Sequence, residues 1–210
     1  MTRLKVAVRV RPMSERELEL GCVPVVSAES ENTLAVTNLK VAESGAGDSR
    51  ERVRRFAYDC CFHELATQDE IFDAVENIIG NSIKQRYNSC VLAYGQSSSG
   101  KTHTMMGVPG NPGLTPRLCE KVFDYLRETA VGEEMNDLKV TVSFLEIYNE
   151  KVRDLLDGEC ADNYIARKRL PLKHYVTSPE SLLDLLQKGD RRRRIASTLN
   201  NRRSSRSLWT

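Results

Sequence analysis

Hydrophobic and polar residues alternate near the start of the chain, over residues 4–10, which is the pattern of a half-buried β-strand. The apolar residues that share one face of this strand are Leu4, Val6, Val8 and Val10. Two shorter segments, 24–27 and 33–37, are also candidate strands. Glycine, serine and charged residues dominate 43–55, so we expect a loop there before ordered structure resumes at Phe56.

A capping box at residues 67–70 predicts the start of a long helix. Thr67 is a suitable N-cap, and Glu70 stands three residues later, where its carboxylate can reach back to the N-cap amide. The apolar residues that follow at helical spacing are Ile71, Phe72, Val75, Ile78, Ile79 and Ile83. This stripe predicts a helix packed against a core.

Residues 90–94 form a short, apolar, β-prone run that predicts a buried strand. It leads through a glycine- and serine-rich loop into residues 101–105, which can open a helix. Further along, Thr115 and Pro116 predict an N-cap with proline at the first helical position, and the helix should reach about residue 131.

Residues 137–148 predict a long strand. Its inward positions are Val140, Val142, Phe144 and, depending on register, either Glu146 or Ile147. Ser178 and Pro179 then open another helix, which the arginines at 191–194 either extend or end, and the sequence from Thr198 onward is polar and loop-like. Strands that alternate with helices predict an α/β domain with an open sheet.

The composition is that of an ordinary globular protein, with 40% hydrophobic residues and a net charge of +2 over 210 residues. Residues 164–210 carry 12 Lys and Arg against 3 Asp and Glu, so this C-terminal part of the chain is basic. The six cysteines lack metal-binding spacing and suit reduced thiols, with Cys90 expected to be buried in its strand. With no apolar start and no run long enough for a membrane span, an intracellular chain is expected.

Residues 95–102 carry a complete phosphate-binding loop, Gly-Gln-Ser-Ser-Ser-Gly-Lys-Thr. Gly95 and Gly100 allow the tight turn, and the backbone of Gln96, Ser97, Ser98 and Ser99 can direct N–H groups at a phosphate. Lys101 can reach the β- and γ-phosphates, and the Thr102 hydroxyl can ligate Mg²⁺. The sequence therefore predicts a site for a nucleoside triphosphate with Mg²⁺.

Four other stretches decide which class of triphosphatase this is: Val8 to Pro12, Tyr87 to Gln96 with His103 to Met105, Ser143 to Glu150, and Asn201 to Ser207. In this order they resemble the kinesin motor domain from Val6 to Ser207. The resemblance implies a motor fold with a central, mostly parallel sheet flanked by helices. It also implies ATP and Mg²⁺ as ligands, microtubules as partner, and a cytoplasmic, cytoskeletal location.

The resemblance also assigns roles to single residues. Arg9, Arg11 and Pro12 would frame the adenine, with His103 on its other side. Asn201 and residues 204–206 would form the first nucleotide-sensing switch. Within it, the implied catalytic residues are Ser204 near the γ-phosphate, Ser205 near Mg²⁺, and Arg206.

Two positions depart from the family pattern. Ser98 stands where the family usually has glycine, at a cost on the order of 1 kcal/mol if its φ is positive. Leu208 stands where the switch usually has histidine. We therefore divide the chain into a partial motor domain over 1–207 and a divergent tail over 208–210.

Several family features are missing from these 210 residues. No Asp-x-x-Gly motif, the second switch of the family, is present. In the family's strand order, the strand at 90–94 lies between strands from the later part of the domain, so it would lack both neighbours. No heptad repeat indicates a coiled coil. The expectation is a truncated motor domain that binds ATP and microtubules but is non-motile, with doubtful ATPase activity.

A non-enzymatic alternative is a regulatory fragment that binds a partner or microtubules through its basic C-terminal third. Its basic loop, 167–169 with Lys173 and His174, lies where kinesins make a secondary microtubule contact. Nucleic-acid binding through the arginines is not expected, because aromatic stacking residues are almost absent beside them.

Overall fold

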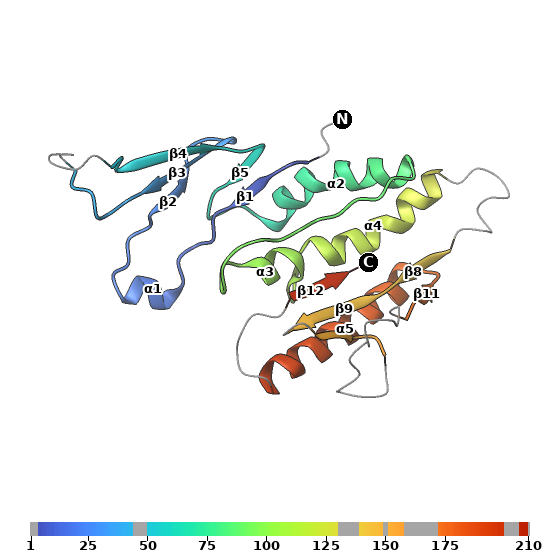
Figure 1. The fold of residues 1–210 in the computed structure, drawn as a ribbon. Helices are drawn as coiled ribbons and strands as arrows, with labels where there is room; N and C mark the ends of the chain where they lie inside the picture. The colour runs from blue at the N-terminus through green and yellow to red at the C-terminus, as the bar shows by residue number, and fades with distance from the viewer. Residues whose placement is uncertain are drawn as a thin grey trace. The chain divides into compact units, whose positions relative to one another are not determined.

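The computed structural model describes residues 4–43, 50–129, 139–148, 151–157, 172–199 and 206–209. It divides the chain into two compact units, Met1–Ile71 and Phe72–Thr210 (Figure 1). Each unit contains helices and strands, so the expected α/β class holds for the described residues.

The first unit is built on short strands. Strand β1 (Ala7–Arg9) pairs in parallel with β5 (Cys60–Phe62), and β2 (Val26–Ala28), β3 (Thr33–Thr37) and β4 (Val53–Ala57) form an antiparallel sheet. The short helix α1 (Glu15–Glu19) lies between β1 and β2 in sequence. The buried side chains of this unit include Leu34, Ala35, Val41, Cys61 and Ala66.

The strands of this unit correct two predicted boundaries. The predicted strand at 4–10 is only three residues long, and Leu4 is 74% exposed because only Ala7–Arg9 has ladder partners. The loop expected over 43–55 ends earlier than predicted, since residues 53–55 belong to β4 and pair with β3. The strands expected near 24–27 and 33–37 are confirmed as β2 and β3.

Helix α2 (Gln68–Lys84) begins at the predicted capping box. The Thr67 amide donates to Glu70 Oε2 at 2.6 Å, and the Glu70 amide donates to Thr67 Oγ1 at 3.2 Å. These hydrogen bonds lower the pKa of Glu70. Of the predicted apolar stripe, Ile71, Phe72 and Ile79 are buried, whereas Ile78 is 43% exposed.

In the second unit, α3 (Lys101–Met105) is followed by a small hairpin of β6 (Gly107–Val108) and β7 (Asn111–Pro112) and then by α4 (Leu114–Thr129). The predicted N-cap of α4 was wrong by one or two residues. Leu114, which is buried, is already helical, so Thr115 lies inside the first turn instead of capping it. The predicted end near residue 131 lies outside the described residues.

The predicted strand at 137–148 is divided at Ser143 into β8 (Val140–Val142) and β9 (Phe144–Tyr148). Strand β8 pairs with β11 (His174–Val176), whereas β9 pairs with β10 (Lys151–Asp154), so the two halves join different sheets. The inward residue at the end of β9 is Glu146, which is 5% exposed, whereas Ile147 is 37% exposed.

Helix α5 (Pro179–Leu199) packs against this region and carries the arginines at 191–194 within its length. The core of the unit is formed by Cys119, Phe123, Val142, Phe144, Leu155, Leu156, Val176, Leu182 and Leu186. The expectation of a loop from Thr198 onward was wrong at both ends. The helix continues to Leu199, and β12 (Arg206–Trp209) pairs with β9, Leu208 opposite Leu145.

The expected central parallel sheet is not formed by the described strands. They form five small sheets, in which the β1–β5 pair is the parallel one. Residues 90–94, where a strand was predicted, have no ladder partners among the described residues. Cys90, expected to be buried, is exposed. A run this apolar forms a buried strand only when neighbouring strands satisfy its backbone, and none among the described residues does so.

Candidate functional site

The phosphate-binding loop lies directly before α3, as the sequence predicts. Gly100 is the residue before the helix and has φ 97°, a left-handed conformation that favours glycine. At Gly95 a Cβ atom would lie 2.5 Å from Ser99 Oγ, closer than any real contact allows. The two glycines of the motif are therefore required by the local backbone and by the close approach of Ser99.

Lys101 is folded back over the loop. Its ammonium group donates hydrogen bonds to the carbonyl oxygens of Gly95, at 2.8 Å, and Gln96, at 2.6 Å. The Ser99 amide also donates to the Gln96 carbonyl, at 3.3 Å. The lysine thus holds a cationic group over the loop backbone, the place where a phosphate of the expected ligand would need positive charge.

Ser98 adopts φ 64°, so the residue that departs from the family's glycine has the left-handed conformation considered above. Ser97 is not among the residues of positive φ. Among the non-glycine residues of the loop, Ser98 is therefore the one with a strained backbone conformation.

Thr102 and His103 occupy the first turn of α3, and both are exposed. An exposed Thr102 hydroxyl beside Lys101 fits the expected Mg²⁺ ligand. His103 takes part in an interaction within the chain. Among the described residues, no group of three His, Cys, Asp or Glu side chains gathers in a way that could hold a metal ion.

Arg9 belongs to the first unit and points at the start of α2. Its guanidinium donates to Gln68 Oε1 at 2.9 Å and to the Ala66 carbonyl at 3.1 Å. Gln68 is 2% exposed, and burial lowers the pKa of Arg9. Arg9 therefore ties β1 to α2 within its unit, a structural contact that the sequence analysis missed.

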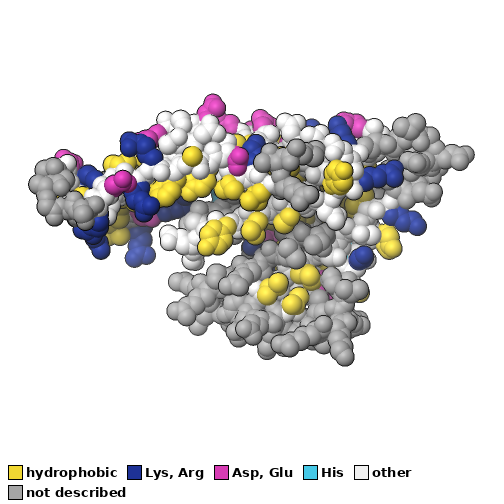
Figure 2. Space-filling model, turned by 45° about the horizontal axis from the view of Figure 1, so that its top comes forward, with side chains coloured by type: hydrophobic (Ala, Val, Ile, Leu, Met, Phe, Trp, Pro, Cys, Tyr) yellow, Lys and Arg dark blue, Asp and Glu magenta, His cyan; other side chains and the backbone are white. Residues whose placement is uncertain are grey.

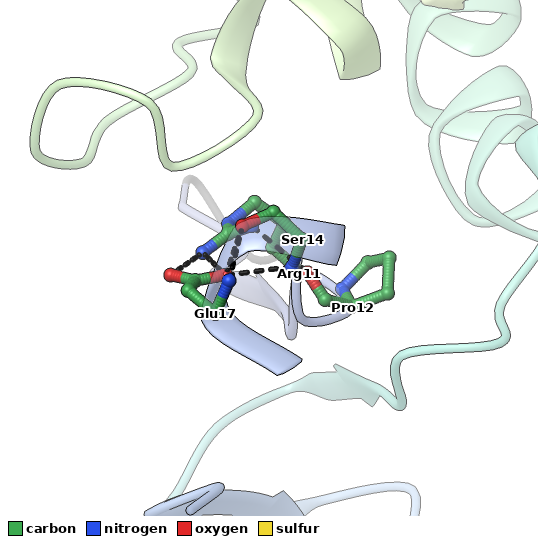
Figure 3. A network of polar contacts seen from close by, with 4 residues as sticks. All are labelled: Arg11, Pro12, Ser14 and Glu17. Atoms are coloured by element: carbon green, nitrogen blue, oxygen red, sulfur yellow. Dashed lines mark hydrogen bonds and ion pairs between the residues drawn. The ribbon is translucent and has the colours of Figure 1, made fainter. Parts of the chain in front are cut away.

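Arg11 is held by the cap of α1 (Figure 3). Its guanidinium donates to both carboxylate oxygens of Glu17 and, at 2.9 Å, to the Pro12 carbonyl. Glu17 also accepts from the Ser14 amide at 2.6 Å and closes a capping box with that residue. The adenine assignment of Arg11 and Pro12 stays a prediction, and in this structure the Arg11 guanidinium is engaged by Glu17.

The assigned switch residues are only partly described. Ser204 and Ser205, like Asn201, lie outside the described residues. Arg206 begins β12 and stands opposite Ile147 of β9. The basic loop at 167–169 lies outside the described residues as well.

Two arginines of the run 191–194 are used inside the fold. Arg192 donates to the carbonyls of Leu155 and Asp157, both at 2.9 Å. Arg193 forms a buried ion pair with Asp190 at 2.7 Å. The Arg192 bonds tie α5 to the turn after β10, whereas the ion pair of Arg193 with Asp190 lies within α5. Both leave fewer charges of the run available to an outside partner.

The sequence of residues 9–208 matches the model of the kinesin motor domain family. The chain belongs to this family. Kinesin motor domains bind ATP with Mg²⁺ and bind microtubules.

Relatives extend the kinesin match over nearly the whole chain. Kinesin-like protein KIF16B of Mus musculus is 40% identical over 225 residues, which cover 99% of this chain and 17% of that protein. StAR-related lipid transfer protein 9 of Homo sapiens is 37% identical, over 99% of this chain and 5% of that protein. The chain therefore spans a small part of the length of these relatives.

A solved structure described as that of a fast kinesin, with implications for ATPase mechanism and interactions with microtubules, resembles the fold with a TM-score of 0.77 and 31% identity. The match covers 98% of this chain and 58% of the solved one. The kinesin fold is thus present in part. In the described part of the chain, no helix has the length and apolar character that crossing a membrane requires.

Proposed function

We propose that this chain binds ATP with Mg²⁺ through Gly95–Thr102 and acts as the nucleotide-binding part of a microtubule motor. The observation that carries the proposal is the position of Lys101, whose ammonium group lies 2.8 Å and 2.6 Å from two carbonyl oxygens of its own loop. A loop that keeps a cation over its backbone and needs glycine at both ends fits a polyphosphate.

Four residues of the loop have a stated task in this proposal: Gly95, Gly100, Lys101 and Thr102. Lys101 exchanges its carbonyl partners for β- and γ-phosphate oxygens, while Gly95 and Gly100 keep the backbone close to them. Thr102 offers its exposed hydroxyl as a ligand of Mg²⁺. Mg²⁺, when bound, neutralises phosphate charge.

Hydrolysis is a separate proposal. Ser204, Ser205 and Arg206 are the candidate catalytic residues that respond to the γ-phosphate. The 210 residues contain no Asp-x-x-Gly motif, whose carboxylate would hold the Mg²⁺ water and whose glycine would sense the γ-phosphate. We therefore expect the 210-residue chain to bind nucleotide without microtubule-stimulated turnover and without movement.

The test is equilibrium binding of a fluorescent ATP analogue with Mg²⁺ to the purified chain. Lys101→Ala should weaken binding by about tenfold or more, because it removes the cation that contacts the phosphates. Lys40→Ala, at an exposed lysine of the first unit, is the matched control and should bind like the wild type. Equal affinities of wild type and Lys101→Ala would contradict the proposed site.

Microtubule binding is tested by co-sedimentation at low and raised salt, together with phosphate release. Binding that weakens with salt and persists in Lys101→Ala would favour the regulatory alternative over a nucleotide-coupled one. Phosphate release stimulated by microtubules would disprove the expectation that this chain lacks turnover.

A further inference from the structure

Strand β4 is an edge of the antiparallel sheet in the first unit, since this sheet has the order β2-β3-β4. Two backbone bonds fix the direction of its peptide groups. The Asn38 amide donates to the Arg52 carbonyl at 2.7 Å, and the Tyr58 amide donates to the Asn32 carbonyl at 2.9 Å. Hydrogen-bonded pairs recur at every second position of an antiparallel ladder, so the even-numbered residues of β4 bond to β3 and the odd-numbered ones point away from it.

The outward N–H and C=O groups of β4 are those of Val53, Arg55 and Ala57. Within the described part of the chain, no group bonds to them. The sheet is made from one stretch of sequence, 26–57, in the first unit. The later strands of the kinesin pattern are expected beside residues 90–94, which belong to the second unit, so they do not account for the free edge of β4.

The edge strand is basic. Arg54 is exposed, its guanidinium carbon lies 5.3 Å from the centre of the Phe56 ring, and it forms no ion pair with the residues that the structure describes. Arg55 points to the other face of the sheet, where it pairs with Glu29 at 2.7 Å while its side chain stays 60% exposed. On the face drawn in Figure 2, Lys and Arg side chains gather over this sheet, at the left of the picture. Residues 50–57 include four arginines and one glutamate.

The arginines decide which partner this edge accepts. A second copy of β4 paired about its two adjacent arginines would place arginine against arginine, and like charges directly opposite each other destabilise a sheet. A strand with carboxylates opposite Arg54 and Arg55 forms favourable pairs on both faces instead. Exposed ion pairs are weak, so Glu29 does not withhold the Arg55 guanidinium from such a strand. Charge therefore selects an acidic partner over a second copy.

We propose that the outer edge of β4 binds an extended acidic segment of another protein as an additional strand. The backbone of Val53, Arg55 and Ala57 supplies the hydrogen bonds, and Arg54 and Arg55 pair with two adjacent carboxylates. Val53 and Phe56 flank the two arginines, so the segment that fits reads apolar-acidic-acidic-apolar. This pattern is the same in both directions, so it fits a parallel or an antiparallel strand. The surface lies in the first unit and needs no nucleotide.

The test is fluorescence anisotropy of a short labelled peptide with Val-Glu-Glu-Val at its centre, added to the purified 210-residue chain. Wild type should bind this peptide, more weakly as salt is raised. The matched peptide with Val-Gln-Gln-Val at its centre should bind about fivefold more weakly. Arg54→Glu should weaken binding of the glutamate peptide by about fivefold or more, because it turns an attraction into a repulsion. Arg16→Glu, at an exposed arginine of α1, should bind it like wild type.

Hydrogen exchange followed by NMR separates an added strand from a loose attraction between charges. On peptide binding, the amides of Val53, Arg55 and Ala57 should exchange more slowly, whereas those of Arg54 and Phe56, which already bond to β3, should change little. Uniform protection of these five amides, or none, overturns the proposal. Equal affinities for the two peptides overturn it as well, and this comparison needs only the wild-type chain. A third contradicting result is an Arg54→Glu chain that folds and binds the glutamate peptide like wild type.

Discussion

Nη2 of Arg11 lies 2.7 Å and 2.9 Å from the two carboxylate oxygens of Glu17, the residue that closes the capping box of α1. The same carboxylate accepts the Ser14 amide at 2.6 Å. Arg11 is therefore both a member of a helix cap and a candidate adenine contact. Any adenine contact by its guanidinium has to coexist with Glu17 or displace it.

Titration of Glu17 tests this cap. The hydrogen bonds from Arg11, followed by those from Ser14, lower the pKa of Glu17 from 4.5 to about 2. A lowered pKa means that the ionised carboxylate stabilises the fold above its ordinary pKa, and that this contribution is lost as pH falls from about 4.5 toward 2. The carboxyl carbon shift of Glu17 followed by NMR should report a midpoint near the lower value.

Arg11→Ala is the variant that decides the cause of this shift. Without the guanidinium, the midpoint of Glu17 should move upward, while the Ser14 bonds keep it from returning fully to the ordinary value. A midpoint that is the same in Arg11→Ala and wild type would show that Arg11 does not hold the carboxylate in solution.

Replacement of Ser98 by glycine should stabilise the nucleotide-free chain. Ser98 has φ 64°, where a non-glycine residue is strained, so Ser98→Gly should raise the free energy of unfolding by about 0.5–1 kcal/mol. Ser97→Gly is the matched control. The φ of Ser97 is not positive, so glycine relieves no strain there. Because glycine also adds freedom to the unfolded chain, Ser97→Gly should lower the free energy of unfolding by roughly 0.4–1 kcal/mol. Urea unfolding measures both, and equal effects of the two variants would contradict the strain at Ser98.

Gly189 lets α5 approach the core. A Cβ atom there would overlap the ring of Phe144, which is 0% exposed. Gly189→Ala should therefore lower the free energy of unfolding by about 1–3 kcal/mol, although alanine is the better helix former. Lys188→Ala, at the exposed neighbour on the same helix, should change it by less than about 0.5 kcal/mol. Unfolding by urea measures the difference, and a stabilised Gly189→Ala would show that α5 does not pack on Phe144 this closely.

Tyr125 joins α4 to α2 through a hydrogen bond from its hydroxyl to Glu76 Oε1 at 2.9 Å. Tyr125→Phe should lower the free energy of unfolding by about 0.5–1.5 kcal/mol. Tyr87→Phe, at a tyrosine that is 65% exposed, should change it little. Similar losses of unfolding free energy in the two variants would show that the hydrogen bond to Glu76 does not stabilise the fold.

The same tyrosine predicts a loss of stability in alkali. Burial, together with the bond to Glu76, raises the pKa of Tyr125 from 10.0 to about 12. A raised pKa means that the protonated form stabilises the fold below the ordinary value, and that this contribution is lost as pH rises through 10 toward 12. Wild type should lose more stability than Tyr125→Phe between neutral pH and about 11, as measured by urea unfolding. Parallel losses would contradict the shift.

Local signals in the sequence were sufficient for several elements. The capping box at 67–70 placed the start of α2 correctly, because both partners of a capping box lie within four residues. The loop at 95–102 and the helix after it were likewise predicted, since the glycines and Lys101 act on their own neighbourhood.

Pairing between distant segments could not be predicted in the same way. Residues 90–94 have the composition of a buried strand, but no described strand lies beside them, and composition alone cannot supply a neighbour. Conversely, the polar sequence before Trp209 suggested a loop, yet β12 forms because the edge of β9 is available to it. The engagement of Arg11 by Glu17 was also missed, because family likeness assigned the arginine to a ligand and not to its own helix cap.

The bonds of Lys101 to its own loop also make this side chain a structural tether in the nucleotide-free chain. Phosphate binding is then an exchange of partners, and the measured affinity is a difference between two sets of contacts. Lys101→Ala changes both the nucleotide-bound and the nucleotide-free chain, because it removes the cation that would contact phosphate and also frees the carbonyls of Gly95 and Gln96. Loss of binding in this variant will therefore report a loosened loop as well as a missing charge, and the two can be separated by comparing loop exchange rates without nucleotide.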